Sequence, residues 1–263
     1  MATGIPQRFC LALAAALSVT AVAGAATAPA PKAFAPITVF AAASLTDAFP
    51  ALDPAETYSF AGSNTLATQI VSGAPADVFA SANQTIPAML YQQGLVEKPV
   101  DFTRNTLVII VPKANPAAIT NIYDLTKPGV SIDVANPAVP VGSYTLSILK
   151  NMALTSRITP NVVSQENDVR TVLTKVVLGQ VDAGFVYATD ARTVPGQVLV
   201  IKVPAWAQPK VTYALAVVTK SPNQAAAQAF IKRVLSKAGQ AKLQAFGFLP
   251  LPYSPQLAGV FRK

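Results

Sequence analysis

Short apolar segments of strand length alternate with helical patterns along this chain from Pro36 onward. In the first set, the strand-like segments lie at 37–41, 57–60, 77–80 and 106–111, and the helical patterns begin at Ser44 and cover 64–72 and 84–93. A second set follows Pro112, with strand-like segments at 123–125, 130–134 and 183–187 and helices from about Ser143 and Asp168. This alternation predicts an α/β fold in which mostly parallel sheets are flanked by helices.

The two sets indicate two lobes. A long apolar strand at 211–218 and a helix from Asn223 to about Ala245 follow the second set, and we expect them to return the chain to the first lobe. The predicted first lobe therefore comprises 37–111 and 212–263, and the second lobe 112–211. Because ligands of such folds bind outside the carboxyl ends of the strands, we expect a ligand cleft between the lobes.

Residues 1–28 have the pattern of a secretory signal peptide, with a short start ending in Arg8, an apolar run to Val22 and small residues after it. The run is shorter than the ~20 residues that span a bilayer, which disfavours an uncleaved membrane anchor. Residues 29–36 are interpreted as a flexible leader. The sequence thus predicts an exported protein, in the periplasm or at the outer face of the cytoplasmic membrane, that loses its single cysteine, Cys10, with the signal peptide.

A formal net charge of +8 favours anionic partners, although a generally basic surface is the simpler explanation. Nucleic acid is not expected, because no run of basic residues is longer than Lys232-Arg233 and no aromatic residues interleave with basic ones.

The chain has no histidine, which excludes Ser-His-Asp triads and removes the usual ligand of zinc sites. The acidic residues Asp133, Glu166, Asp168 and Asp182 form no paired motif in the sequence, and no phosphate-binding glycine loop is present. A secreted serine hydrolase would need a lysine base, and neither Ser44 nor Ser63 lies in a Ser-x-x-Lys motif. We therefore predict a binding protein with no catalytic residues and no cofactor.

Ser44 and Ser63 each stand where an apolar strand pattern gives way to a helical one. The N–H groups of a helix's first turn are unpaired and carry partial positive charge, and a serine hydroxyl adds a further donor. Two such positions on adjacent strands predict a cradle for an oxyanion. The alternative is that both serines are ordinary helix N-caps.

Three further positions could supply donors. A loop stiffened by Pro137 and Pro140 leads into a helix near Gly142, so that the backbone N–H groups of Val141 and Gly142 could face a ligand. Asp168 is a candidate N-cap for a helix opened by Val169, and that helix start could equally be structural. Tyr187 ends an apolar strand, where its hydroxyl could reach the cleft or satisfy a bond in the core.

Five motifs in order along the chain resemble those of the periplasmic molybdate-binding proteins of molybdate ABC importers: 37–45, 60–63, 72–79, 168–170 and 184–187. The resemblance implies a type II periplasmic-binding-protein fold whose two lobes close on a tetrahedral oxyanion. By position, it implies hydroxyl and amide ligands from Ser44 and Ser63, backbone N–H donors from Val141 and Val169, and a hydroxyl donor from Tyr187. The segment between Ser44 and Ser63 is shorter than usual for this family, which predicts a truncated first helix.

From the resemblance we expect a monomer that captures molybdate and tungstate for the membrane permease of an ABC importer. The metal would enter only as the oxyanion, without direct metal ligands from the protein. A sulfate-binding or other tetrahedral-oxyanion-binding protein is the alternative in the same class.

Overall fold

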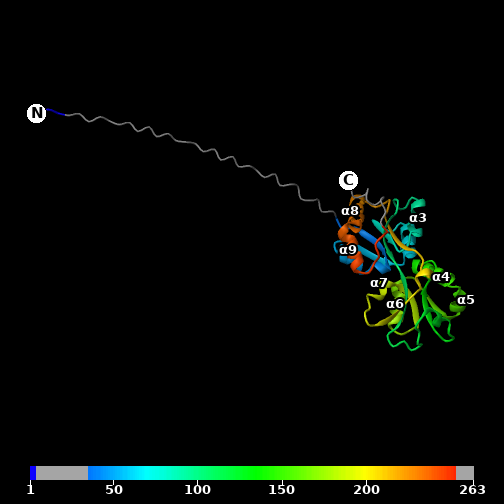
Figure 1. Cartoon of the computed structure of the whole chain (residues 1–263). Helices are drawn as coiled ribbons and strands as arrows, with labels where there is room; N and C mark the ends of the chain where they lie inside the picture. The colour runs from blue at the N-terminus through cyan, green and yellow to red at the C-terminus, as the bar shows by residue number, and fades with distance from the viewer. Residues whose placement is uncertain (4–34, 253–263) are drawn as a thin grey trace. The chain divides into compact units, whose positions relative to one another are not determined.

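The computed structural model describes residues 1–3 and 35–252, and Figure 1 shows their elements. The predicted signal peptide and leader lie almost entirely outside these residues, so the structure does not test them. Within the described ranges, no helix combines the length and the apolar character that crossing a bilayer requires.

The first sheet has the strand order β2-β1-β3-β10-β4. Its strands are β1 (Thr38–Ala42), β2 (Thr57–Ala61), β3 (Val78–Ser81), β4 (Val100–Asn105) and β10 (Val211–Val217). Strand β1 pairs in parallel with β2 and β3, whereas β10 is antiparallel to both β3 and β4. The late strand β10 therefore completes the first lobe, as the sequence predicts.

The second sheet has the order β7-β6-β8-β5-β9. Its strands are β5 (Leu107–Pro112), β6 (Ile132–Ala135), β7 (Val162–Glu166), β8 (Ala183–Tyr187) and β9 (Val198–Lys202). Strand β6 is parallel to β7 and β8, and β5 is antiparallel to β8 and β9. The two-lobed α/β fold is confirmed, with mixed rather than mostly parallel sheets.

One lobe boundary differs from the prediction. The sequence places the segment 106–111 at the end of the first lobe, but β5 pairs with β8 and β9 in the second sheet. The first sheet is closed instead by β4, whose sequence VDFTRN has too many polar residues to give a strand pattern. The chain therefore passes between the lobes at Thr106, and the boundary expected after 111 moves to that residue.

Helices flank both sheets (Figure 1). Those next to the first sheet are α1 (Ala48–Leu52), α2 (Ser63–Val71), α3 (Thr85–Gln92), α8 (Gln224–Leu235) and α9 (Lys237–Ala245). Those next to the second sheet are α4 (Pro140–Asn151), α5 (Thr155–Ile158), α6 (Val169–Val177) and α7 (Ala188–Ala191). Short 3-10 helices lie at η1 (Ala43–Leu45), η2 (Ile122–Thr126), η3 (Thr159–Asn161) and η4 (Ala205–Ala207).

Three of these elements bear on the predictions. Helix α1 has only five residues, as the short segment before Ser63 predicts. The expected strand at 123–125 is part of η2, which Asn121 caps through its side chain. The expected single helix from Asn223 to Ala245 is interrupted at Ser236, whose extended backbone and capping hydroxyl start α9.

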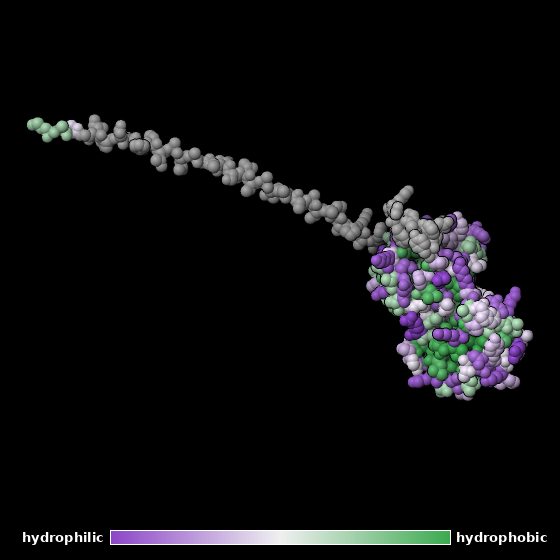
Figure 2. Space-filling model, viewed as in Figure 1, coloured by the Kyte–Doolittle hydropathy of each residue, from purple (hydrophilic) through white to green (hydrophobic). Residues whose placement is uncertain are grey.

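The core of the first lobe contains an aromatic cluster in which the rings of Phe102 and Phe230 lie 5.9 and 5.6 Å from that of Phe49. In the second lobe, β8 is buried along its whole length. Figure 2 shows a green, apolar area on the lobe that carries α4–α7, framed by polar residues. The outer strands of that sheet include exposed apolar side chains, namely Val163, Leu199 and Val200.

Candidate functional site

A small cavity of about 10 Å³ lies where the two lobes meet. This is far less than the ~300–1,000 Å³ of pockets for drug-sized ligands, so any ligand held here must be small. Residues from both lobes line it: Ala42, Ala43, Ser44, Ala61, Gly62, Ser63, Ala82, Val139, Pro140, Val141, Val169 and Tyr187. All five residues that the sequence singles out as ligands thus line one cavity.

Neither serine is a helix cap. Ser44 lies inside η1, where Ala42 is the N-cap residue, and its Oγ is 2.9 Å from the Tyr213 hydroxyl. Ser63 is the first residue of α2, after the N-cap Gly62, and its Oγ accepts a hydrogen bond from the Ala82 N–H at 3.1 Å. A hydroxyl that accepts in this way keeps its own hydrogen free to donate. The ordinary N-cap interpretation of these serines is therefore wrong.

The second lobe contributes two helix starts. Helix α4 begins at Pro140, two residues before the expected start, and the Ser143 N–H makes its first backbone bond, to the Val139 carbonyl. The N–H groups of Val141 and Gly142 in this first turn have no helical acceptor. Proline at the first helical position fits, because it has no N–H to leave unpaired.

Helix α6 is capped as predicted. The Asp168 carboxylate accepts bonds from the Thr171 N–H at 2.9 Å and from the Thr171 hydroxyl at 3.0 Å. This cap uses the third N–H of the helix and leaves that of Val169, which lines the cavity, for another acceptor. The cap and a ligand-binding role for Val169 are thus compatible.

The Tyr187 side chain supplies an unsatisfied donor. It is 1% exposed, and its Oη has no hydrogen-bond partner among the described residues. Burial raises the pKa of this phenol well above its ordinary value, with the neighbouring Tyr213 contributing, so the hydroxyl keeps its proton. Leaving a buried hydroxyl unpaired costs about 1–3 kcal/mol. A ligand in the cavity would remove this penalty.

The lobes approach each other closely at the cavity. A Cβ atom on Gly62 of the first lobe would lie 2.2 Å from the carbonyl oxygen of Asn167 in the second lobe. The Tyr144 hydroxyl of α4 reaches the Ala82 carbonyl of the first lobe at 3.4 Å. The structure is therefore that of a closed cleft.

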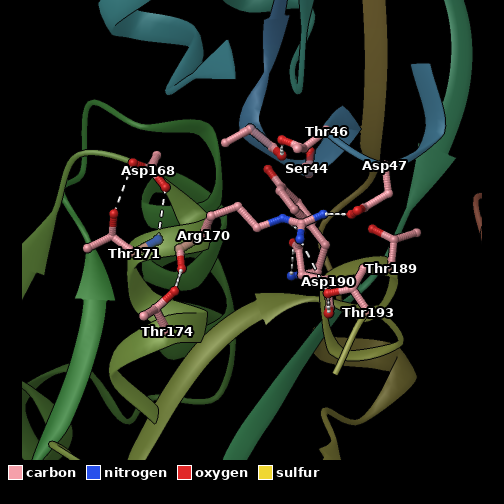
Figure 3. A network of polar contacts seen from close by, with 12 residues as sticks. Ser44, Thr46, Asp47, Asp168, Arg170, Thr171, Thr174, Thr189, Asp190 and Thr193 are labelled. Carbon is pink, nitrogen blue, oxygen red and sulfur yellow. Dashed lines mark hydrogen bonds and ion pairs between the residues drawn. The ribbon is translucent and has the colours of Figure 1, made fainter. Parts of the chain in front are cut away.

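Among the residues that the structure describes, no lysine, arginine, aspartate or glutamate lines the cavity. The nearest charges form a network in which Arg170 pairs with Asp47 and Asp190 (Figure 3). Burial raises the pKa of Asp190 to about 7, although the charge of Arg170 opposes that rise. None of these three charged side chains is part of the cavity wall, so an anion in the cavity would be met by neutral dipoles.

Three residues behind the site, Asn105, Thr189 and Tyr213, are not predicted from the sequence. The Asn105 amide donates to the Tyr213 hydroxyl at 3.3 Å and to the Thr189 hydroxyl at 2.9 Å. Asn105 ends β4, beside the passage to the second lobe. No local pattern could reveal these contacts, because the partners are 84 or more residues apart.

The arrangement offers no route to serine hydrolysis. The partners of Ser44 and Ser63 are a phenol and a backbone amide, and neither is a base at neutral pH. Within the described ranges, no group of three or more acidic or cysteine side chains could hold a metal ion.

Known proteins resemble this chain in sequence. The molybdate-binding protein ModA of Mycobacterium tuberculosis is 39% identical over 222 residues, which cover 81% of this chain and 84% of that protein. The ModA protein of Haemophilus influenzae is 34% identical over 232 residues, which cover 81% of this chain and 89% of that protein. The thiosulfate-binding protein of Pseudomonas aeruginosa is 30% identical over 234 residues, covering 77% and 70%.

Solved structures show the same fold. The periplasmic molybdate-binding protein of Azotobacter vinelandii matches with a TM-score of 0.73 at 22% identity, covering 82% of this chain and all of that one. The sulfate-binding protein SubI of Mycobacterium tuberculosis matches with a TM-score of 0.69 at 21% identity, covering 86% and 89%. Residues 37–249 match the family model described as bacterial extracellular solute-binding protein, and the chain belongs to that family.

Proposed function

We propose that this protein captures molybdate, and tungstate, and delivers it to the membrane permease of an ABC importer. The observation that carries the proposal is the small cavity between the lobes, which is lined by neutral donors; among them is the Tyr187 hydroxyl, which has no partner among the described residues. The ligands are the Ser44, Ser63 and Tyr187 hydroxyls and the backbone N–H groups of Val141 and Val169. The molybdate-binding relatives support this choice of anion.

The energetics are sufficient for tight binding. Hydrogen bonds to a charged group contribute ~1.5–3 kcal/mol each. Several of them, after the costs of association and closure, reach the ~8–12 kcal/mol of micromolar to nanomolar affinity. Neutral donors also favour the fully deprotonated anion, because a protonated oxygen would oppose a donor with a donor.

Selectivity would come from the size of the cavity. Molybdate and tungstate have nearly the same size, charge and geometry, so the closed site distinguishes them weakly. Sulfate is smaller, and donors fixed on two lobes cannot all shorten onto it. Losing two good hydrogen bonds would cost ~3 kcal/mol, or at least a hundredfold in affinity.

A sulfur oxyanion is the second candidate. The thiosulfate-binding relative, 30% identical to this chain, favours it. The absence of carboxylates from the cavity wall argues against a protonated phosphate, which would need an acceptor for its proton.

We also propose that the protein acts outside the cytoplasm as a monomer, without a cofactor and without direct metal ligands. The description of its family as extracellular supports the location. The compartment would be the periplasm or the outer face of the cytoplasmic membrane.

Titration calorimetry of the protein lacking 1–28 tests the function. We expect one molybdate per chain, a higher melting temperature with molybdate, and sulfate affinity at least a hundredfold weaker. Sulfate displacing molybdate at comparable concentration would establish the sulfur-oxyanion alternative. No binding of molybdate, tungstate, sulfate or thiosulfate would overturn the proposal altogether.

A further inference from the structure

An ion-pair network lies beside the cavity and bridges the two lobes (Figure 3). Arg170 of α6 reaches across to Asp47, which precedes α1 in the first lobe. Within its own lobe, its Nε lies 3.0 Å from Asp190 Oδ1 and its Nη1 donates to the Thr193 hydroxyl at 3.3 Å. One guanidinium therefore holds a partner in each lobe.

The two pairs differ in their surroundings. Asp190 is fully buried, and its other oxygen accepts the Tyr187 N–H at 3.3 Å, so the Arg170–Asp190 pair is part of the second lobe. The Asp47 side chain is 44% exposed and comes from the opposite lobe. Asp190 and Thr193 thus hold the Arg170 guanidinium in position. Asp47 can pair with it only when the two lobes are close together.

Each member of the network is close in sequence to a residue of the cavity wall. Asp47 follows Ser44 by three residues, Arg170 follows Val169 directly, and Asp190 follows Tyr187 by three. None of the three charged residues lines the cavity itself. The network can therefore fix the position of the first lobe's side of the cavity relative to the second lobe's side without contacting the ligand.

Resting on the proposed function, we propose that Asp47, Arg170 and Asp190 form a latch that holds the lobes closed over the bound oxyanion, with Asp47 as its detachable half. Asp47 is then a positioning residue that sets how long the ligand stays bound. Since the latch recognises the closed arrangement and not the anion, it strengthens the binding of every anion that fits by the same factor.

Asp47→Asn tests this, because it removes the charge and keeps the size of the side chain. We expect molybdate affinity to fall about three- to tenfold, mainly through faster dissociation in stopped-flow measurements. The ratio of molybdate to sulfate affinity should stay unchanged. The variant should lower the melting temperature of the molybdate-saturated protein and leave that of the empty protein unaltered, because an open cleft has no such pair to lose.

Asp53→Asn is the matched control. Asp53 follows α1, and its Oδ2 lies 2.5 Å from Nε of Arg233 in α8, so this ion pair lies within the first lobe. We expect it to leave molybdate affinity and dissociation rate unchanged.

Two results would overturn the latch while leaving the proposed function intact. One is wild-type affinity and dissociation rate in Asp47→Asn. The other is an equal loss of melting temperature with and without molybdate, which would make Asp47 a structural residue only. A wild-type protein that binds no oxyanion would overturn the proposed function, and the latch with it.

Discussion

Tyr213 lies directly behind Ser44, with 2.9 Å between the two side-chain oxygens, although 169 residues separate them in the sequence. Because the Asn105 amide donates to the Tyr213 oxygen, the Tyr213 hydrogen can be donated to Ser44. Ser44, which lines the cavity, then keeps its own hydrogen for a ligand. The hydrogen bonds from the Asn105 amide to Tyr213 and from Tyr213 to Ser44 thus fix the direction in which the Ser44 hydroxyl donates.

Tyr213→Phe should therefore weaken molybdate binding about three- to tenfold without removing any group from the cavity wall, because one neutral hydrogen bond behind Ser44 is lost. Ser44→Ala should weaken binding more. In calorimetry, the double variant should bind no more weakly than Ser44→Ala alone, since Tyr213 acts through Ser44. Additive losses would show that Tyr213 acts by another route.

Tyr187→Phe should affect the loaded protein and leave the empty one nearly unchanged. Among the described residues its hydroxyl has no partner in the closed cleft, so losing this donor should weaken molybdate binding, whereas water can satisfy the hydroxyl when the empty cleft is open. Melting curves with and without molybdate measure both effects. The exposed Tyr91 offers a control, Tyr91→Phe, which should change neither. Wild-type molybdate affinity in Tyr187→Phe would contradict a donor role for this hydroxyl.

Gly62→Ala should keep the fold and lose affinity. The backbone of Gly62 has a φ of −58°, which suits any residue, but a Cβ there would lie 2.2 Å from the Asn167 carbonyl of the other lobe. We expect at least about a tenfold loss of molybdate affinity in calorimetry, because overpacking of this kind costs about 1–3 kcal/mol.

Gly73→Ala is the contrasting variant. Its φ of +85° strains an alanine, while nothing lies within 4 Å of the added Cβ. It should lower stability and leave affinity unchanged. Normal molybdate affinity in Gly62→Ala would mean that binding does not need the lobes this close.

Asp133→Asn should change how stability depends on pH. Burial, aided by the charge of Glu166, raises the pKa of Asp133 from 3.8 to about 7. The folded protein thus favours the protonated form of Asp133. The contribution of this group to the stability of the fold is complete below about pH 4 and is lost as the pH rises through 7. The free energy of unfolding of the variant, relative to that of the wild type, should increase between pH 5 and 8, by at most about 4 kcal/mol. Urea unfolding at both pH values measures it, and parallel profiles would refute the assignment.

The sequence predicts those parts of the site that depend on local structure. Ser44, Ser63 and Tyr187 stand at or just after strand ends, and Val141 and Val169 stand in the first turns of helices, so periodicity makes them candidates. Their assignment as ligands comes from the resemblance to molybdate-binding proteins. Arg170 also stands in a recognised motif, but its partners Asp47 and Asp190 are visible only once the lobes are assembled. The same is true of Asp133 and Glu166, which have no paired motif in the sequence and come together through neighbouring strands β6 and β7.

Strands β4 and β7 and the break between helices α8 and α9 were not predicted from the sequence, for physical reasons. Strands β4 and β7 contain polar and charged residues, because half of β4 is only half-buried and part of β7 is exposed, and so they lack an apolar run. The interruption at Ser236 did have a local signal, a serine three residues before Gly239, whose N–H it accepts at 3.1 Å. The apolar spacing that continues across this serine hid the signal.

Strand β10 has a consequence for the order in which this chain can fold. It lies between β3 and β4 in the first sheet but comes from residues 211–217, so the ribosome must make about four-fifths of the chain before that sheet can be completed. Until then β3 and β4 lack the strand that joins them, and the first lobe cannot reach its native state. The first lobe of a nascent chain with this topology therefore stays incomplete late into synthesis, and an incompletely folded segment is what a translocation channel for unfolded polypeptides requires.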